Sequence, residues 1–274
     1  MNIELSTRSV IYSIEEAIMT ITLNREEKFN ALGKGELKLL KQSLDLAAED
    51  GSVRCVILRG SGKAFCSGID IEEVSFNLSD EGSNFLERYF NPVLTTIMKM
   101  PKPVVVEVEG WVSGAGCGLA LVSDFIVCSE TSEFHFAYKD LGLVPNAGCA
   151  WLLPKLIGLS KSKQVLMSSG FMSAKEALDL GVVFELAPSQ EVGAVSRQLA
   201  QNLSNSATLS LGECKRLISQ SHLTSFEAYL ESEQIAQTRL LKSMDIKAGV
   251  LSFLNNTKPT FIGGGSEISL WKNA

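Results

Sequence analysis

A glycine-rich turn in residues 110–121 is the stretch of this chain best suited to chemistry. It follows an apolar run at 104–108 that predicts a buried strand, and it passes through Gly114, Gly116 and Gly118 into a segment that predicts a buried helix. Such a turn leaves backbone N–H groups pointing at one spot, with the helix dipole behind them. That spot can bind a phosphate or a developing oxyanion. Alternatively, the turn needs glycine only for its dihedral angles or for close packing.

A second glycine stretch, residues 60–70, has a similar character. Its sequence is Gly-Ser-Gly-Lys-Ala-Phe-Cys-Ser-Gly-Ile-Asp, and it follows an apolar run at 53–58 that predicts another buried strand. Glycine turns are common, so one of them says little about function. Two, each placed after a buried strand, favour a functional site.

Composition and charge narrow the class of protein. The chain has 274 residues, of which 45% are hydrophobic and 20% are charged, as in an ordinary globular protein. A net charge of −6 leaves no basic surplus for binding nucleic acid. No apolar run reaches the roughly 18 residues of a membrane span. The N-terminus lacks the apolar segment of a signal peptide, so we expect a cytoplasmic protein.

The cysteines and histidines do not predict a metal centre. Two histidines are too few for a histidine-rich site, and the six cysteines show no paired spacing. We therefore expect buried free thiols and no bound metal. The cysteines are Cys55, Cys66, Cys117, Cys128, Cys149 and Cys214.

Hydrophobic periodicity predicts an α/β protein with a helical C-terminal part. A strand-strand-helix pattern is followed by a glycine loop and then repeats. We expect a core at 1–190, a helical region at 191–262 and a flexible tail at 263–274. Strands are expected at 9–14, 17–23, 53–58, 104–108, 125–128, 133–136 and 182–186, and helices at 35–50, 89–100, 116–122, 149–157, 160–168 and 173–180.

Three stretches together resemble the signature of the crotonase (enoyl-CoA hydratase/isomerase) superfamily. They are residues 21–32, 63–71 and 110–120, and their order and spacing match. Residues 136–154 and 249–261 look closest to the phenylacetate-pathway enoyl-CoA isomerase branch. The resemblance implies a ClpP-like spiral of strand-strand-helix units, with a helical C-terminal region for assembly as a homotrimer or a dimer of trimers. It also implies a small-molecule acyl-CoA substrate, with coenzyme A as part of the substrate and no permanently bound cofactor.

The resemblance places a thioester oxygen between the backbone N–H groups of Ile69 and Ala115. Removing a proton next to a thioester makes an enolate whose charge collects on that oxygen. Two preorganised donors could stabilise it by several kcal/mol in the transition state.

Matching by position also assigns a binding site for coenzyme A. Lys28 and Lys63 could bind phosphates as point charges, although solvated loop lysines would look the same in the sequence. For Asp70 we favour capping of its own turn or helix over a chemical role. The full set is Lys28, Ala31, Lys63, Ala64, Ser67, Gly68, Ile69, Asp70, Gly114 and Ala115.

The usual catalytic carboxylates are missing. The two glutamate positions of the family's hydratases correspond to Gly118 and Tyr138, and neither residue is a useful base near neutral pH. The isomerase carboxylate position corresponds to Asn146, whose amide cannot accept a proton, although it can hydrogen-bond a ligand or cap a helix. We therefore expect isomerase-like chemistry more than hydration, with Asn146 and Tyr138 at the catalytic positions.

Three functions remain open. The first is an enzyme on acyl-CoA thioesters that uses another base, such as Asp140, Asp70, Glu133 or a carboxylate from residues 80–87. The second is a catalytically quiet acyl-CoA-binding scaffold. The third is a decarboxylase acting on carrier-bound acyl groups, in which loss of carbon dioxide replaces deprotonation. We favour the first.

Overall fold

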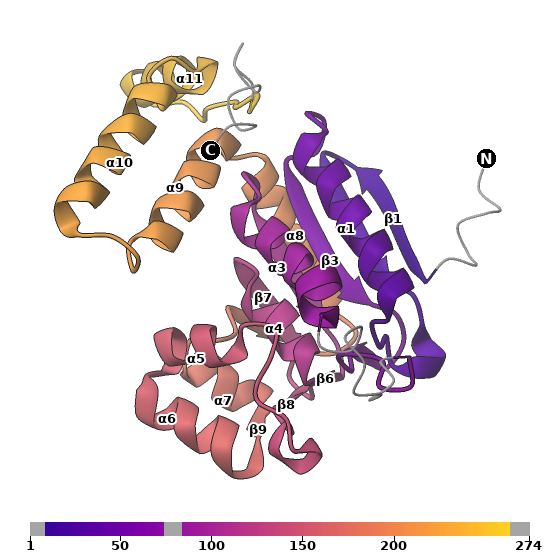
Figure 1. Ribbon diagram of the computed structural model, residues 1–274. Helices are drawn as coiled ribbons and strands as arrows, with labels where there is room; N and C mark the ends of the chain where they lie inside the picture. The colour runs from indigo at the N-terminus through magenta and orange to yellow at the C-terminus, as the bar shows by residue number, and fades with distance from the viewer. Residues whose placement is uncertain (1–8, 74–83, 264–274) are drawn as a thin grey trace.

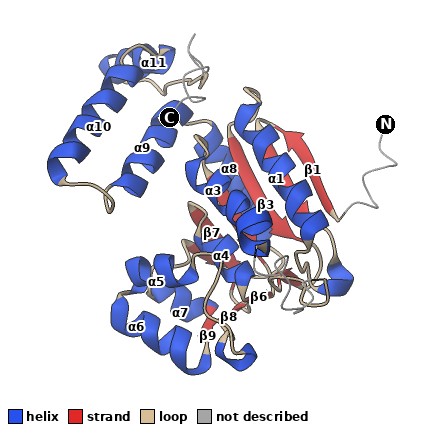
Figure 2. Ribbon diagram, in the orientation of Figure 1, coloured by secondary structure: helices blue, strands red, loops and turns tan. Residues whose placement is uncertain are grey.

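The computed structural model describes residues 9–73 and 84–263, and its centre is a six-stranded sheet (Figures 1 and 2). The first two strands form an antiparallel hairpin, and each later strand joins the sheet in parallel. The order is β1 (Val10–Glu15), β2 (Ile18–Leu23), β3 (Cys55–Gly60), β5 (Val104–Val108), β7 (Phe125–Ser129) and β10 (Glu185–Ala187).

Helices cover both faces of this sheet, which explains its continuous apolar strands. In β3, Val56 and Leu58 point to the face covered by α1 (Lys34–Glu49) and α3 (Asn91–Lys99). The alternate residues Cys55 and Ile57 join a second cluster with residues of α8 (Val192–Ser204). The main sheet is therefore buried on both sides.

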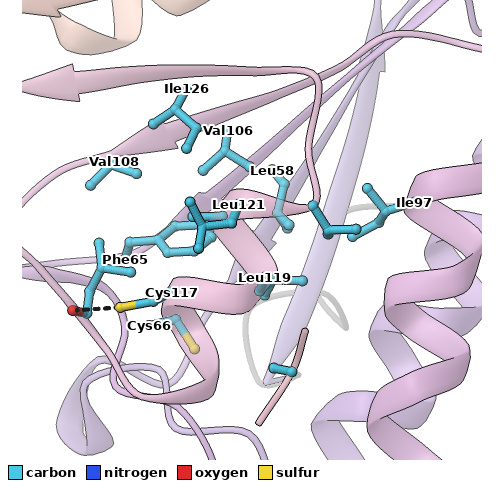
Figure 3. Packing of buried hydrophobic residues seen from close by; sticks show 14 of the residues in the cluster. Leu58, Phe65, Cys66, Ile97, Val106, Val108, Cys117, Leu119, Leu121 and Ile126 are labelled. Carbon is cyan, nitrogen blue, oxygen red and sulfur yellow. Dashed lines mark hydrogen bonds between the residues drawn. The ribbon is translucent and has the colours of Figure 1, made fainter. Parts of the chain in front are cut away.

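A second, four-stranded sheet supports the glycine turns. Its strands are β4 (Ala64–Cys66), β6 (Trp111–Ser113), β8 (Glu133–His135) and β9 (Phe171–Ser173), in that order. The helix α4 (Ala115–Leu121) follows β6 directly, and every one of its residues is buried. Figure 3 shows Cys117, Leu119 and Leu121 of α4 among apolar side chains of the surrounding strands and of α3. The start of α4 is thus anchored in the core.

The remaining helices complete the spiral and extend it. The π-turn η2 (Leu86–Phe90) precedes α3, and the short 3-10 turns are η1 (Glu26–Lys28) and η3 (Lys139–Leu141). After β8 come α5 (Cys149–Ile157), α6 (Leu159–Gln164), the π-turn η4 (Val165–Ser169) and α7 (Ala174–Asp179). The chain ends in α9 (Thr208–Gln220), α10 (Phe226–Leu240) and α11 (Met244–Leu254), which project away from the main sheet (Figure 1).

The predicted α/β architecture is confirmed, with differences in detail. The strand expected at 182–186 starts only at Glu185, and the helix expected at 160–168 is α6 followed by η4. Ser173 caps α7 by accepting a hydrogen bond from the N–H of Glu176 at 3.2 Å. Five of the cysteines are buried free thiols, whereas Cys214 is exposed. Residues 264–274 of the expected tail lie outside the described residues.

The predicted division of the chain stays a prediction. The first helix of the 191–262 region, α8, packs against β3 and β5, so it belongs structurally with the core. No helix within 9–73 or 84–263 is long and apolar enough to cross a membrane.

Candidate active site

The backbone around Ile69 presents a free N–H group. Leu32 forms a parallel bridge with Ile69: the N–H of Leu32 donates to the carbonyl of Gly68 at 2.8 Å, and the N–H of Asp70 donates to the carbonyl of Leu32 at 3.1 Å. Because Leu32 uses the groups on either side of Ile69, the N–H of Ile69 points away from this bridge. It donates to no group in the described part of the chain.

The start of α4 presents a second free N–H group next to the first. The N–H of Gly114 donates to the carbonyl of His135 at 2.9 Å, whereas Ala115, the first residue of α4, has no backbone acceptor within the described chain. A Cβ placed on Gly68 would lie 3.1 Å from the nitrogen of Ala115 and 2.9 Å from the carbonyl oxygen of Ser113. The two turns therefore touch, and Gly68, with φ of 97°, is the residue that lets them do so.

Hydrogen bonds between the loop before α1 and residues 61–68 stabilise the turn at Ile69. Asn30, buried and left-handed with φ of 58°, donates from Nδ2 to the carbonyls of Ser61 and Ala64 at 2.9 and 2.7 Å. The thiol of Cys66 donates to the carbonyl of Asn30 at 3.3 Å and accepts the N–H of Gly68 at 3.4 Å. Burial raises the pKa of this thiol to about 12, so it stays protonated as a donor.

The residues predicted to bind coenzyme A surround these turns. The hydroxyl of Ser67 donates to the carbonyl of Lys28 at 3.2 Å, which brings the first and second signature stretches together. Lys28 forms an ion pair with Glu72, and that hydrogen bond raises the pKa of the ammonium group. Lys63 is exposed, and the buried Ala64 pairs with Trp111 in the second sheet. The binding roles themselves stay predictions.

Gly118, at the first glutamate position, has no room for a side chain. A Cβ there would lie 2.1 Å from the carbonyl oxygen of Ala147 and 2.5 Å from its Cβ. Ala147 itself has φ of 51°, an uncommon conformation for a residue with a side chain. Gly118 lies three residues after Ala115 on α4, so about one helical turn, roughly 5 Å, separates the residue that Ala147 contacts from the free N–H. Asn146, which precedes Ala147, is therefore brought close to the site.

Tyr138, at the second glutamate position, is buried and held inside the protein. Its hydroxyl lies 3.2 Å from Sγ of Cys149. Burial, followed by the neighbouring thiols Cys149 and Cys117, raises the pKa of the phenol far above its ordinary value. Its hydroxyl can therefore act only as a neutral hydrogen-bonding group.

The side chain of Asn146 does not serve as a helix cap. The N-cap of α5 is Gly148, which has no side-chain cap, and the backbone carbonyl of Asn146 accepts the N–H of Cys149 at 3.1 Å. Oδ1 of Asn146 is buried without a hydrogen-bond partner among the described residues. An unpaired buried amide oxygen is costly, and this atom is free to accept a hydrogen bond from a ligand or a water molecule.

The structure places each of the other carboxylates that we considered as the general base in a different environment. Asp70 is buried and paired with Arg25, and its Oδ1 also accepts the N–H of Glu72 at 3.1 Å. Glu133 lies 3.1 Å from Nε2 of His135, on the second sheet. Asp140 is exposed on η3. Residues 80–83 of the remaining candidate segment lie outside the described residues.

Comparison with known proteins identifies the family. The family described as enoyl-CoA hydratase/isomerase matches residues 13–264. The 1,2-epoxyphenylacetyl-CoA isomerase of Escherichia coli is 30% identical, over 93% of this chain and 98% of that protein. The trans-2-decenoyl-[acyl-carrier-protein] isomerase of Streptococcus mutans is 26% identical, over 93% of this chain and 98% of that protein. The crystal structure of an enoyl-CoA hydratase from Bacillus anthracis superposes with a TM-score of 0.88 at 25% identity, covering 94% of this chain and all of the other. With its parallel sheets, buried glycine turns and a match along nearly its whole length, the chain belongs to the enoyl-CoA hydratase/isomerase family, the crotonase superfamily.

Proposed function

We propose that this protein binds acyl-CoA thioesters and stabilises their enolates with the N–H groups of Ile69 and Ala115. The observation that carries the proposal is that both groups lack acceptors among residues 9–73 and 84–263 and lie on two touching turns. A thioester oxygen between them would receive two hydrogen bonds from a rigid backbone, and these strengthen as negative charge develops. Coenzyme A enters as part of the substrate, with no permanently bound cofactor.

We propose isomerisation rather than hydration as the reaction. A hydratase of the two-glutamate type needs two carboxylates to position a water molecule. Gly118 has its side-chain space filled by Ala147, and the phenol of Tyr138 has a strongly raised pKa. Two of the relatives are isomerases by name, and Asn146, which corresponds to the isomerase carboxylate position, has a buried oxygen with no hydrogen-bond partner in the part of the chain that the structure describes.

A second candidate is the same chemistry on an acyl group attached to a carrier protein. The Streptococcus mutans relative is named for an acyl-carrier-protein substrate. In addition, the ion pair with Glu72 partly neutralises Lys28, one of the two lysines predicted to bind the nucleotide phosphates. A carrier-bound substrate lacks that nucleotide and would not need this charge.

The test of the proposed function is a comparison of two ligands that differ at the carbonyl. We expect acetoacetyl-CoA to bind at least about tenfold more tightly than free coenzyme A, because only the thioester can fill the two-donor site. Calorimetric titration measures both affinities, and the enolate absorbance of bound acetoacetyl-CoA reports the charge on oxygen. Equal affinities would contradict the proposal. Tight thioester binding without turnover of any enoyl substrate would identify a scaffold instead.

We also propose that the protein is a homotrimer or a dimer of trimers. Large apolar side chains are exposed along the projecting C-terminal helices, which is unfavourable for an isolated chain. Examples are Phe226, Leu241, Leu251, Phe253 and Leu254, each between 59% and 84% exposed. We expect light scattering to give three or six times the 29.7 kDa chain mass, and a monomer at micromolar concentration would refute this assembly.

A further inference from the structure

Arg25 lies where three backbone segments around the site meet. Its Nη1 is 2.8 Å from Oδ2 of Asp70 and 3.5 Å from Oε2 of Glu36. The same nitrogen donates to the backbone carbonyl of Ala31 at 3.4 Å. One guanidinium group therefore contacts the turn at Asp70, the first turn of α1 and the loop that precedes α1.

Asp70 is next in sequence to the proposed oxyanion site, and Ala31 and Glu36 are connected to that site through the loop that contains Leu32. Asp70 directly follows Ile69, whose N–H is one of the two donors. Ala31 directly precedes Leu32, the residue whose backbone bridges to Ile69. Glu36 accepts the N–H of Gly33 at 3.0 Å and so fixes the other end of the same loop.

Because the carboxylates around Arg25 are buried, their contacts with it add little to the free energy of unfolding. The same contacts do restrict the positions of the three segments. The side chains of Asp70 and Glu36 are only 6% and 13% exposed. Burying such carboxylates has a desolvation cost that a single guanidinium only partly offsets. One nitrogen, Nη1, makes all three contacts, so a single atom fixes the positions of the three segments relative to one another.

We propose that Arg25 is a positioning residue that aims the N–H of Ile69 at the thioester oxygen. This role rests on the proposed oxyanion site. Only one peptide unit separates the Asp70 side chain from the donor, so loosening Asp70 lets the Ile69 N–H rotate away from Ala115. A misplacement of about 1 Å at a reacting centre can reduce rate about 100-fold.

The test is Arg25→Lys, which keeps the positive charge but replaces the guanidinium with an ammonium group on a shorter side chain, so the nitrogen no longer lies at the Nη1 position. We expect the preference for acetoacetyl-CoA over free coenzyme A to fall about tenfold, with a matching loss of enolate absorbance. Affinity for free coenzyme A should stay within about twofold, because that ligand has no thioester oxygen. Glu36→Gln, which removes the charge of a partner of Arg25 outside the predicted coenzyme A set, should show a selective loss of the same kind and serves if Arg25→Lys does not fold.

Arg216→Lys provides the matched control. Arg216 in α9 contacts the buried carboxylate of Glu213 at 2.7 Å, and Arg239 contacts the same carboxylate at 3.2 Å, so this is a similar junction outside the proposed site. It should lower thermal stability without changing the ligand preference.

The outcomes separate the two proposals. A parent protein without thioester preference would overturn the proposed function and, with it, the role of Arg25. A parent with that preference and an Arg25→Lys variant that keeps it would overturn the role of Arg25 alone. Equal weakening of both ligands in Arg25→Lys would likewise show that Arg25 is only structural.

Discussion

Replacing Ala115 by proline should reduce turnover of an acyl-CoA thioester about 100- to 1000-fold, the usual effect of deleting one oxyanion donor. Proline removes the N–H and puts its ring carbon where the hydrogen pointed, so the thioester oxygen loses both a partner and space. The fold should tolerate the change, because Ala115 is the first residue of α4 and its N–H has no acceptor in the described chain. Steady-state kinetics and a thermal melt would measure the two effects.

Leu159→Pro is a control for the loss of an N–H at the first residue of a helix, at an exposed position where Ala115 is buried. Leu159 is the first residue of α6, it follows a glycine with positive φ just as Ala115 does, and it is 63% exposed. Its backbone N–H also donates to no group within the described residues. Proline there should leave activity unchanged. If Ala115→Pro folds, binds coenzyme A and turns over at the parental rate, the N–H of Ala115 is not an oxyanion donor.

The elements of the main sheet could be predicted because each carries its own pattern. The apolar run of β5 is confirmed residue for residue, and the helix expected at 35–50 is α1, shifted by a single residue. The strands β4, β6 and β9 escaped prediction. Each has only three residues and lies directly beside a turn or a helix start, and its pairing depends on turns that place the short strands side by side.

The candidate site could be predicted at its glycines but not at its contacts. The contact between the two turns requires glycine at positions 68 and 114, so the presence of glycine there indicates the turns in the sequence. The sequence could not predict that Ala147 occupies the space beside Gly118. This contact depends on a positive φ at Ala147, and alanine rarely adopts a positive φ. The Arg25–Asp70 pair joins positions far apart in sequence, and no local pattern specifies such a contact.

Changing Asn146 to aspartate should give the protein isomerase activity, or raise an existing activity about 100-fold, the typical contribution of a general base. Oδ1 of Asn146 is buried with no partner among the described residues, and the next residue, Ala147, packs against Gly118, which lies one helical turn after Ala115 on α4. The substitution adds a carboxylate with nearly the same shape, so the loop need not move. The assay converts a 3-enoyl-CoA to its conjugated 2-enoyl isomer and follows the absorbance of the conjugated thioester.

The dependence on pH would show whether the new carboxylate is the base. Burial without a hydrogen-bond partner disfavours the charged form, so the pKa of an aspartate at position 146 should be raised above its ordinary value. The gained activity should therefore rise with pH as this group loses its proton. Because the folded variant then binds more protons than the unfolded chain, its unfolding free energy relative to the parent should fall as pH rises through the same range.

Asn146→Ala is the control, since it removes the amide without adding a base and should gain nothing. An Asn146→Asp variant that folds and binds a thioester but isomerises no faster than the parent would show that position 146 is not a latent base. Strong isomerase activity in the parent would place the base elsewhere, because an amide cannot accept the proton. The exposed Asp140 would then be the next residue to substitute, since Asp70 is held by Arg25 and Glu133 contacts His135.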